Sequence, residues 1–165
     1  MSDFIQAQGS AFVAHRLRRS SDRIVDQTGA LLDMLELDVP PRGASMLLLI
    51  VDQQAIGVVE IARKLRLSHP LIVRMAKRFE ALGLVTIDVD PDDARRRRLV
   101  PTDKAHREAT VVRALHVRLN SLFDALFAEI DCPVIAMLDR LDAALDAVSI
   151  AERLASPLQP ERIIR

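Results

Sequence analysis

The chain has 165 residues, enough for one domain of ordinary size with a hydrophobic core of its own. Half of the residues are apolar, but Trp and Tyr are absent and there are only 5 Phe and 5 Gly, which favours a mostly helical protein with an aliphatic core. The formal net charge is zero, which excludes a uniformly basic nucleic-acid-binding chain but permits one whose charges are segregated.

Apolar residues recur at helical spacing from Phe4 to Leu35 and predict a long N-terminal helix, with Gly9 and Gly29 as places where it could bend. The two prolines at 40–41 are expected to end it, because a proline disfavours helical geometry in the residue before it. A short and very apolar helix is then predicted at 44–51, and its lack of a polar face predicts burial on all sides.

Two shorter helices are predicted next. The first covers residues 58–65. The second begins after Ser68, a residue type that caps helices, has Pro70 in its first turn, and closes at Gly83 in a left-handed conformation. The buried face of the second helix is predicted to consist of Ile72, Met75, Ala76 and Phe79.

Residues 84–89 have the composition of a strand, and residues 97–100 could pair with them across a loop. The loop opens with the acidic turn 90–93 and ends in four consecutive arginines at 95–98. A basic loop between two short strands, directly after a helix with an exposed polar N-terminus, has the layout of a DNA-binding wing.

Thr102 and Asp103 predict the start of a long helix that continues to about Ile130. Its leucines alternate at spacings of four and three, like a coiled-coil seam: Leu115, Leu119, Leu122, Leu126 and Ile130. Cys132 and Pro133 interrupt the pattern, and a last helix carries Leu138, Leu141, Leu145 and Val148. These terminal helices show more apolar surface than the central module could cover, which predicts a partner chain.

The predicted fold class is therefore mainly α: a winged helix-turn-helix with a small β-hairpin wing, flanked by long N- and C-terminal dimerisation helices. The expected domains are an N-terminal dimerisation helix at 1–38, a winged helix-turn-helix module at 39–101, C-terminal dimerisation helices at 102–156 and a tail at 157–165.

Charge is segregated along the chain. Residues 60–107 contain 12 Lys and Arg against 7 Asp and Glu, whereas the rest of the chain contains 11 against 16. A basic face over the central module can therefore coexist with a neutral total.

The candidate DNA contacts lie on the second short helix and on the wing. Ser68, His69, Arg74 and Lys77 carry hydrogen-bond donors at a spacing that suits a helix in the major groove. Pro70 and Leu71 could contact thymine methyl groups. The arginine run could place one side chain in the minor groove while its neighbours hold phosphates.

These segments resemble the regulators of the multiple-antibiotic-resistance (MarR) type. Residues 58–68 look like the first half of that family's winged helix, and residues 73–85 resemble its recognition helix and the following strand. Residues 90–95 are similar to the wing motif, and residues 102–105 match the start of the helix after the wing.

The resemblance implies a homodimeric repressor that binds a pseudo-palindromic operator as double-stranded DNA and is often released by a small-molecule effector or an oxidant. By position it assigns Ser68, His69, Arg74 and Lys77 to the recognition helix, and Asp93 and Arg95 to the wing motif, with Arg96, Arg97 and Arg98 beside them. The chain departs from the family pattern at Pro70, Leu71, Ala94 and Ala105.

Other chemistries find little support in the sequence. The four histidines, His15, His69, His106 and His116, form no compact metal motif, and no cofactor fingerprint or catalytic triad order is present. Cys132, the single cysteine, could be a redox switch but is more typical of a small packing residue. An enzyme is not expected.

The absence of a signal-peptide pattern and of a long apolar run leads us to expect a cytoplasmic protein. The alternative function is a dimeric winged-helix interaction protein or anti-regulator that has lost DNA binding. The neutral total charge and the apolar pair Pro70-Leu71 motivate that alternative.

Overall fold

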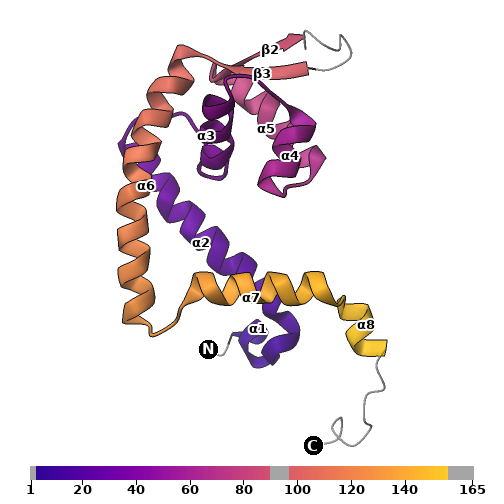
Figure 1. Cartoon of the computed structure of the whole chain (residues 1–165). Helices are drawn as coiled ribbons and strands as arrows, with labels where there is room; N and C mark the ends of the chain where they lie inside the picture. Colours follow the sequence, from indigo (N-terminus) through magenta and orange to yellow (C-terminus); the bar gives the residue numbers. More distant parts are fainter. Residues whose placement is uncertain (1–2, 90–96, 156–165) are drawn as a thin grey trace, which may run out of the picture. The chain divides into compact units, whose positions relative to one another are not determined.

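The computed structural model describes residues 3–89 and 97–155. The described chain is mainly helical with one small antiparallel sheet, as predicted (Figure 1). It divides into two units, Met1–His116 and Val117–Arg165. Among the described residues, no helix is both long enough and apolar enough to cross a bilayer.

The predicted N-terminal helix is interrupted near its start. It consists of a short helix α1 (Phe4–Ala7), a 3₁₀ turn η1 (Gly9–Phe12) and the long helix α2 (Val13–Met34). The break falls at Gly9, whose φ of 68° lies in the left-handed region that a glycine adopts without steric cost. Gly29, the other expected bend, remains inside α2.

Asp3 anchors this short N-terminal element. Its carboxylate accepts a hydrogen bond of 3.0 Å from the Ile5 amide and pairs with the Arg19 guanidinium of α2 at 2.5 Å. The hydrogen bond from Arg19, together with those from backbone amides, lowers the pKa of the Asp3 carboxyl below its usual value.

The expectation that the prolines end the N-terminal helix is wrong. Helix α2 already stops at Met34, and Glu36 turns the chain with a positive φ of 54°. The Leu37 amide then donates to the Leu32 carbonyl at 3.1 Å, which closes the helix end. Pro40 has an extended ψ of 146° and leads into a 3₁₀ turn, η2 (Pro41–Gly43).

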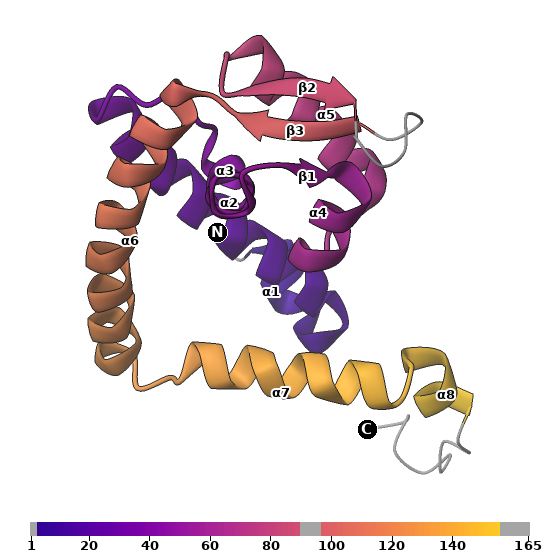
Figure 2. The same cartoon turned by 45° about the horizontal axis from the view of Figure 1, so that its top comes forward.

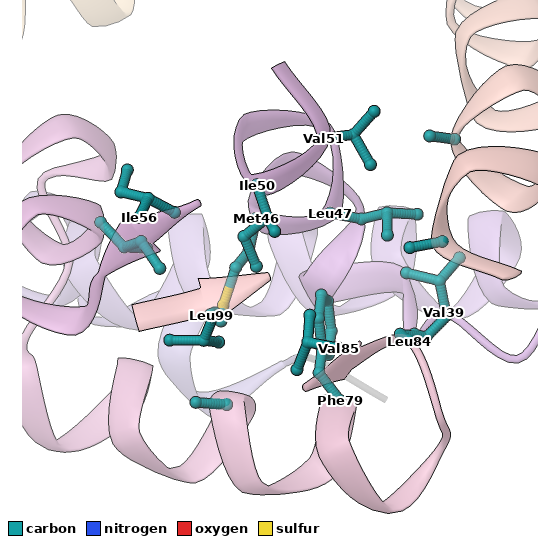
Figure 3. Close-up of a cluster of buried hydrophobic side chains, with 14 of the residues drawn as sticks. Val39, Met46, Leu47, Ile50, Val51, Ile56, Phe79, Leu84, Val85 and Leu99 are labelled. Carbon is teal, nitrogen blue, oxygen red and sulfur yellow. The ribbon is translucent and has the colours of Figure 1, made fainter. Parts of the chain in front are cut away.

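Helix α3 (Ala44–Gln53) supplies the largest share of the core in the first unit. Met46, Leu47, Ile50 and Val51 are buried. Leu48 and Leu49 are only partly buried and Ser45 is exposed, so the predicted burial on all sides is wrong, and α3 buries one face. Figure 3 shows the α3 side chains packed against residues from the helices and strands that follow it in sequence.

The helix-turn-helix is formed by α4 (Val58–Leu65) and α5 (His69–Ala81), with Arg66 in a left-handed conformation between them. At the end of α5, Gly83 has a φ of 68° and the Leu84 amide donates to the Phe79 carbonyl at 2.9 Å. This is the left-handed glycine cap that the sequence predicts.

The wing is a three-stranded antiparallel sheet in the order β1-β3-β2. The predicted hairpin is present as β2 (Val85–Val89) and β3 (Arg97–Pro101), with Ile87 opposite Leu99. The sequence analysis missed a third strand, β1 (Ile56–Gly57), which lies on the other side of β3 (Figure 2). This strand joins the turn before α4 to the wing.

Helix α6 (Asp103–Glu129) begins where the sequence predicts. The Ala105 amide donates to Thr102 Oγ1 at 3.2 Å, the hydrogen bond of an N-cap. On the first turns of α6, Ala105, Ala109 and Val112 are buried and complete the core of the first unit.

The second unit contains the rest of α6, then α7 (Val134–Ala147) and α8 (Ile150–Ala155). Asp131, with a φ of 48°, and Pro133 separate α6 from α7 as expected, whereas α8 was not predicted. On α6, the rings of Phe123 and Phe127 stack with centroids 5.8 Å apart. No residue of α7 or α8 is buried.

Candidate nucleic-acid interface

Helix α5 presents two chemically different faces. Ile72, Ala76 and Phe79 are buried, and Met75 is half-buried, so the predicted apolar face is confirmed. The other face is polar and exposed at Ser68, His69, Pro70, Arg74, Lys77 and Arg78, whereas Leu71 is half-buried. This division holds the polar side chains on a rigid element, away from the core.

The N-terminus of α5 differs from a normally capped helix. Ser68 occupies the N-cap position with an extended ψ of 140°, yet its side chain makes no capping hydrogen bond. Pro70, the second residue of the helix, has no amide hydrogen. One backbone donor is therefore missing from this helix end, while the Ser68 hydroxyl is not engaged in capping.

The two described arginines of the wing have different surroundings. Arg97 stands opposite Val89 and is exposed. Arg98 stands opposite Asp88 and Gly57, is half-buried, and donates from Nη2 to the Ala55 carbonyl at 3.0 Å. Arg98 therefore braces β3 against the turn that precedes β1, a contact that the sequence analysis did not foresee.

The remaining predicted wing contacts fall outside the described residues. Asp93, Arg95 and Arg96 belong to the segment 90–96.

The cations of α5 have no acidic partner in the described part of the chain. Arg74, Lys77 and Arg78 form no ion pair there, whereas Glu60 on α4 lies 3.7 Å from Lys64 and 3.9 Å from Arg63. Uncompensated positive charge on an exposed helix face attracts anions.

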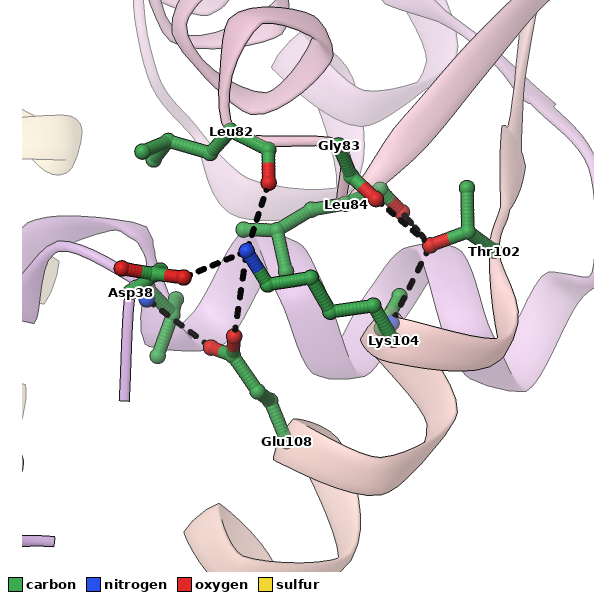
Figure 4. A network of polar contacts seen from close by, with 9 residues as sticks. Asp38, Leu82, Gly83, Leu84, Thr102, Lys104 and Glu108 are labelled. Carbon is green, nitrogen blue, oxygen red and sulfur yellow. Dashed lines mark hydrogen bonds and ion pairs between the residues drawn. The ribbon is translucent and has the colours of Figure 1, made fainter. Parts of the chain in front are cut away.

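The C-terminal end of α5 is held by the start of α6. Thr102 Oγ1 donates to the Gly83 carbonyl at 2.7 Å, and the Thr102 amide donates to the Leu84 carbonyl at 3.1 Å. Beside it, Lys104 Nζ donates to the Leu82 carbonyl at 2.7 Å (Figure 4). The sequence identified Thr102 as a cap of α6, but not that the same residues hold the end of α5.

The hollows on the described surface include a groove in the first unit and a smaller one in the second. A groove of about 430 Å³ runs between α2, η2 and α5 and is lined by residues that include Gly29, Pro41, Arg42 and Arg78. A smaller one, of about 290 Å³, lies at the turn between α6 and α7, where Cys132 is half-buried. Among the residues described, no group of three His, Cys, Asp or Glu side chains could hold a metal ion.

Comparison with known proteins fits this geometry. Residues 37–96 match the model of the MarR family. No curated protein sequence matches the chain significantly.

Several solved structures have a fold similar to that of this chain over most of its length. The transcriptional repressor CouR bound to a 23-mer DNA duplex has a TM-score of 0.66 and 22% identity, over 86% of this chain and 99% of that chain. The MepR–DNA complex of S. aureus has a TM-score of 0.63 and 15% identity, over 78% and 97%. The regulator BldR from Sulfolobus solfataricus has a TM-score of 0.60 and 18% identity, over 90% and 100%.

At these identities the structures establish a shared fold, while the family match covers the segment that contains the helix-turn-helix and the wing strands β1 and β2. Two of the solved structures that share this fold, CouR and BldR, are a transcriptional repressor and a transcriptional regulator. One segment of this chain, residues 37–96, therefore matches the MarR family model, and the described chain has the winged-helix fold of solved MarR-type regulators.

Proposed function

We propose that the protein is a homodimeric transcriptional repressor that binds a pseudo-palindromic operator with one α5 helix of each subunit in the major groove. The observation that carries this proposal is the exposed face of α5, where Arg74 and Lys77 have no acidic partner among the described residues. Phosphates and base edges are the ligands that such a face attracts.

The contacts divide into two groups by their chemistry. On the helix, Ser68, His69, Arg74 and Lys77 donate hydrogen bonds, and Pro70 and Leu71 contact thymine methyl groups. On the wing, Arg95, Arg96, Arg97 and Arg98 bind phosphates or enter the minor groove, and Asp93 belongs to the same DNA-contacting segment. The hydrogen bond from Arg98 to Ala55 supports an additional bracing role for that residue.

The exposed apolar side chains support a dimer. Helices α7 and α8 bury no residue of their own. Large apolar side chains on these helices, and that of Val148 between them, are 36–64% exposed, namely Ile135, Met137, Leu141, Leu145, Val148, Ile150 and Leu154. The seam residues Leu122 and Leu126 of α6 are 55% and 39% exposed. Helices with such exposed apolar side chains are stabilised when a second copy of the chain covers them.

The groove between α2, η2 and α5 is the candidate effector site. One of its walls contains Arg78 of the recognition helix, and another contains Arg42, which pairs with Asp22. A small molecule seated there would contact α2 and α5 together, in a lining that contains the carboxylates of Asp26 and Asp33 as well as the two guanidinium groups. A ligand that binds one orientation of α5 more tightly than another shifts the equilibrium toward the first, by an amount set by the difference between the two affinities.

The test is selection of bound duplexes from a random library by the wild-type protein, followed by measurement of the dissociation constant on the selected duplex. We expect enrichment of an inverted repeat with half-sites about one helical turn apart. A chain that enriches nothing and fails to shift DNA even at low salt would instead be an interaction protein that has lost DNA binding. The neutral total charge and the Pro70-Leu71 pair are the features that favour this alternative.

A further inference from the structure

The first turns of α6 take part in a polar junction at the edge of the core of the first unit, in which Glu108 is buried and Lys104 and Asp38 reach the surface (Figure 4). Lys104 Nζ donates to the Leu82 carbonyl at 2.7 Å and to the Asp38 carboxylate. One turn further along α6, Glu108 accepts a hydrogen bond of 2.9 Å from the Val39 amide, and its Oε1 lies 4.0 Å from Lys104 Nζ. We call these five residues the α6 junction.

The α6 junction joins three segments that are distant in sequence. Asp38 and Val39 follow α2, Leu82 ends the recognition helix, and Lys104 and Glu108 belong to α6. The cation of Lys104 also lies at the carbonyl end of α5, where a helix carries partial negative charge. The orientation of α5 relative to α6 therefore depends on directional hydrogen bonds as well as on packing.

Glu108 is the one charged side chain that is buried among the described residues, with 6% of its surface exposed. Buried ionic groups are not an efficient source of stability, because apolar side chains of similar volume stabilise a core at least as well. Their hydrogen bonds, however, have a narrow range of distance and angle, whereas apolar packing does not. These properties favour a role for the junction in fixing geometry.

The geometry matters because α6 is a single unbroken helix from Asp103 to Glu129. Its start holds the recognition helix, and its later turns carry Leu122 and Leu126, which we propose for the dimer seam. Because α5 ends at the junction, a tilt of about 10° there would move the first turn of α5, about 20 Å away along that helix, by about 3 Å, close to the 3.4 Å rise of one base pair.

We infer that the α6 junction sets the distance between the two recognition helices of the dimer, so that Lys104 and Glu108 are positioning residues that determine which half-site spacing the protein accepts. The inference rests on the proposed function, because it needs a dimer bound to DNA. Under this inference, two residues that contact no base, Lys104 and Glu108, contribute to the choice of operator.

The test uses duplexes that carry the same two half-sites at the preferred spacing and at spacings one and two base pairs shorter or longer, and one duplex with a single half-site. Wild-type protein should favour one spacing. Lys104→Met keeps most of the side-chain length but removes the charge and the donors. We expect it to reduce the ratio of affinities between the best and the other spacings about tenfold, while single half-site binding changes less than twofold.

Two further variants make the test decisive. Glu108→Gln retains an oxygen that can accept from the Val39 amide but removes the charge, and it should also reduce the spacing ratio. Arg113→Met removes the exposed ion pair between α6 and Asp52 of α3, and it should leave the ratio unchanged. Thermal unfolding of each variant establishes that it is folded before binding is measured.

The inference is overturned if Lys104→Met and Glu108→Gln keep the wild-type ratio, or if they weaken binding by the same factor at every spacing and on the single half-site. The second pattern would mean that the junction only stabilises the fold. If the wild-type protein binds none of the duplexes, the proposed function fails, and the inference fails with it. If the wild-type protein binds but the variants have the same spacing ratio as the wild type, only the inference fails.

Discussion

The ring of Phe79 lies against the backbone of Gly43, so closely that a methyl group on Gly43 would sit 2.8 Å from Phe79 Cε1. Phe79 is the buried aromatic residue in the last turns of the recognition helix, and Gly43 precedes α3. The absence of a side chain at residue 43 therefore lets the recognition helix approach the body of the first unit.

Gly43→Ala should destabilise the fold. The backbone at Gly43 has a φ of −96°, which any residue can adopt, so the cost arises from the clash with Phe79 and with Pro40 Cγ at 3.0 Å. Overpacking of this kind costs about 1–3 kcal/mol, and urea unfolding measures it. Gly57→Ala is the control, because a methyl group there would meet only the Arg97 carbonyl at 3.8 Å. Equal stability of Gly43→Ala and wild type would contradict the close approach.

Alanine substitution should change the free energy of unfolding by different amounts at the two N-cap positions, Ser68 and Thr102. Ser68→Ala is expected to cost less than about 0.5 kcal/mol of stability, because no capping hydrogen bond is lost, although a normal N-cap is worth about 1 kcal/mol. Thr102→Ala loses hydrogen bonds to Gly83 and Ala105 and should cost about 1–2 kcal/mol. Only Ser68→Ala should weaken DNA binding without lowering stability. A larger stability loss for Ser68→Ala than for Thr102→Ala would refute this assignment.

The wing arginines should separate into a bracing residue and a contact residue. Arg98→Met removes the hydrogen bond to the Ala55 carbonyl and should cost about 1 kcal/mol of stability. Arg97→Met changes an exposed side chain and should leave the unfolding free energy within about 0.5 kcal/mol of wild type. Chemical denaturation of both variants checks the difference, and identical values for the two would show that Arg98 braces nothing.

The seam of α6 should be required for assembly. Leu122→Glu and Leu126→Glu place charge on side chains that are 55% and 39% exposed in one subunit, so they should cost the isolated chain little stability. In a dimer the same charges would be buried against the partner and would dissociate it. Sedimentation equilibrium should report a monomer for these variants and a dimer for the control Asn120→Glu, which lies off the seam. A wild type that sediments as a monomer would remove the basis for this prediction.

The sequence predicted helix α5 and the β2–β3 hairpin well because the boundaries of these elements depend on local chemistry. Ser68 before an apolar-periodic segment and Gly83 after it define α5, and the strand composition on either side of the basic loop defines the hairpin. These signals require no knowledge of contacts between distant residues.

The features that were missed depend on tertiary contacts or on individual residues. Strand β1 has two residues, too few for a periodic pattern, and it exists because β3 pairs with it. After α2 ends at Met34, Glu36 turns the chain in the left-handed backbone conformation. Residues other than glycine adopt this conformation rarely, so the sequence does not single out Glu36. The bond from Arg98 to Ala55 joins residues 43 positions apart.

The most direct measurement of the central claim is the salt dependence of DNA affinity for the wild type and for the double variant Arg74→Ala with Arg97→Ala. These residues are exposed, on the recognition helix and on the wing. If each contacts one phosphate in both subunits of the dimer, the slope of log affinity against log salt should decrease in magnitude by about 3 to 4. An unchanged slope, or no affinity of the wild type for any duplex at low salt, would contradict the account.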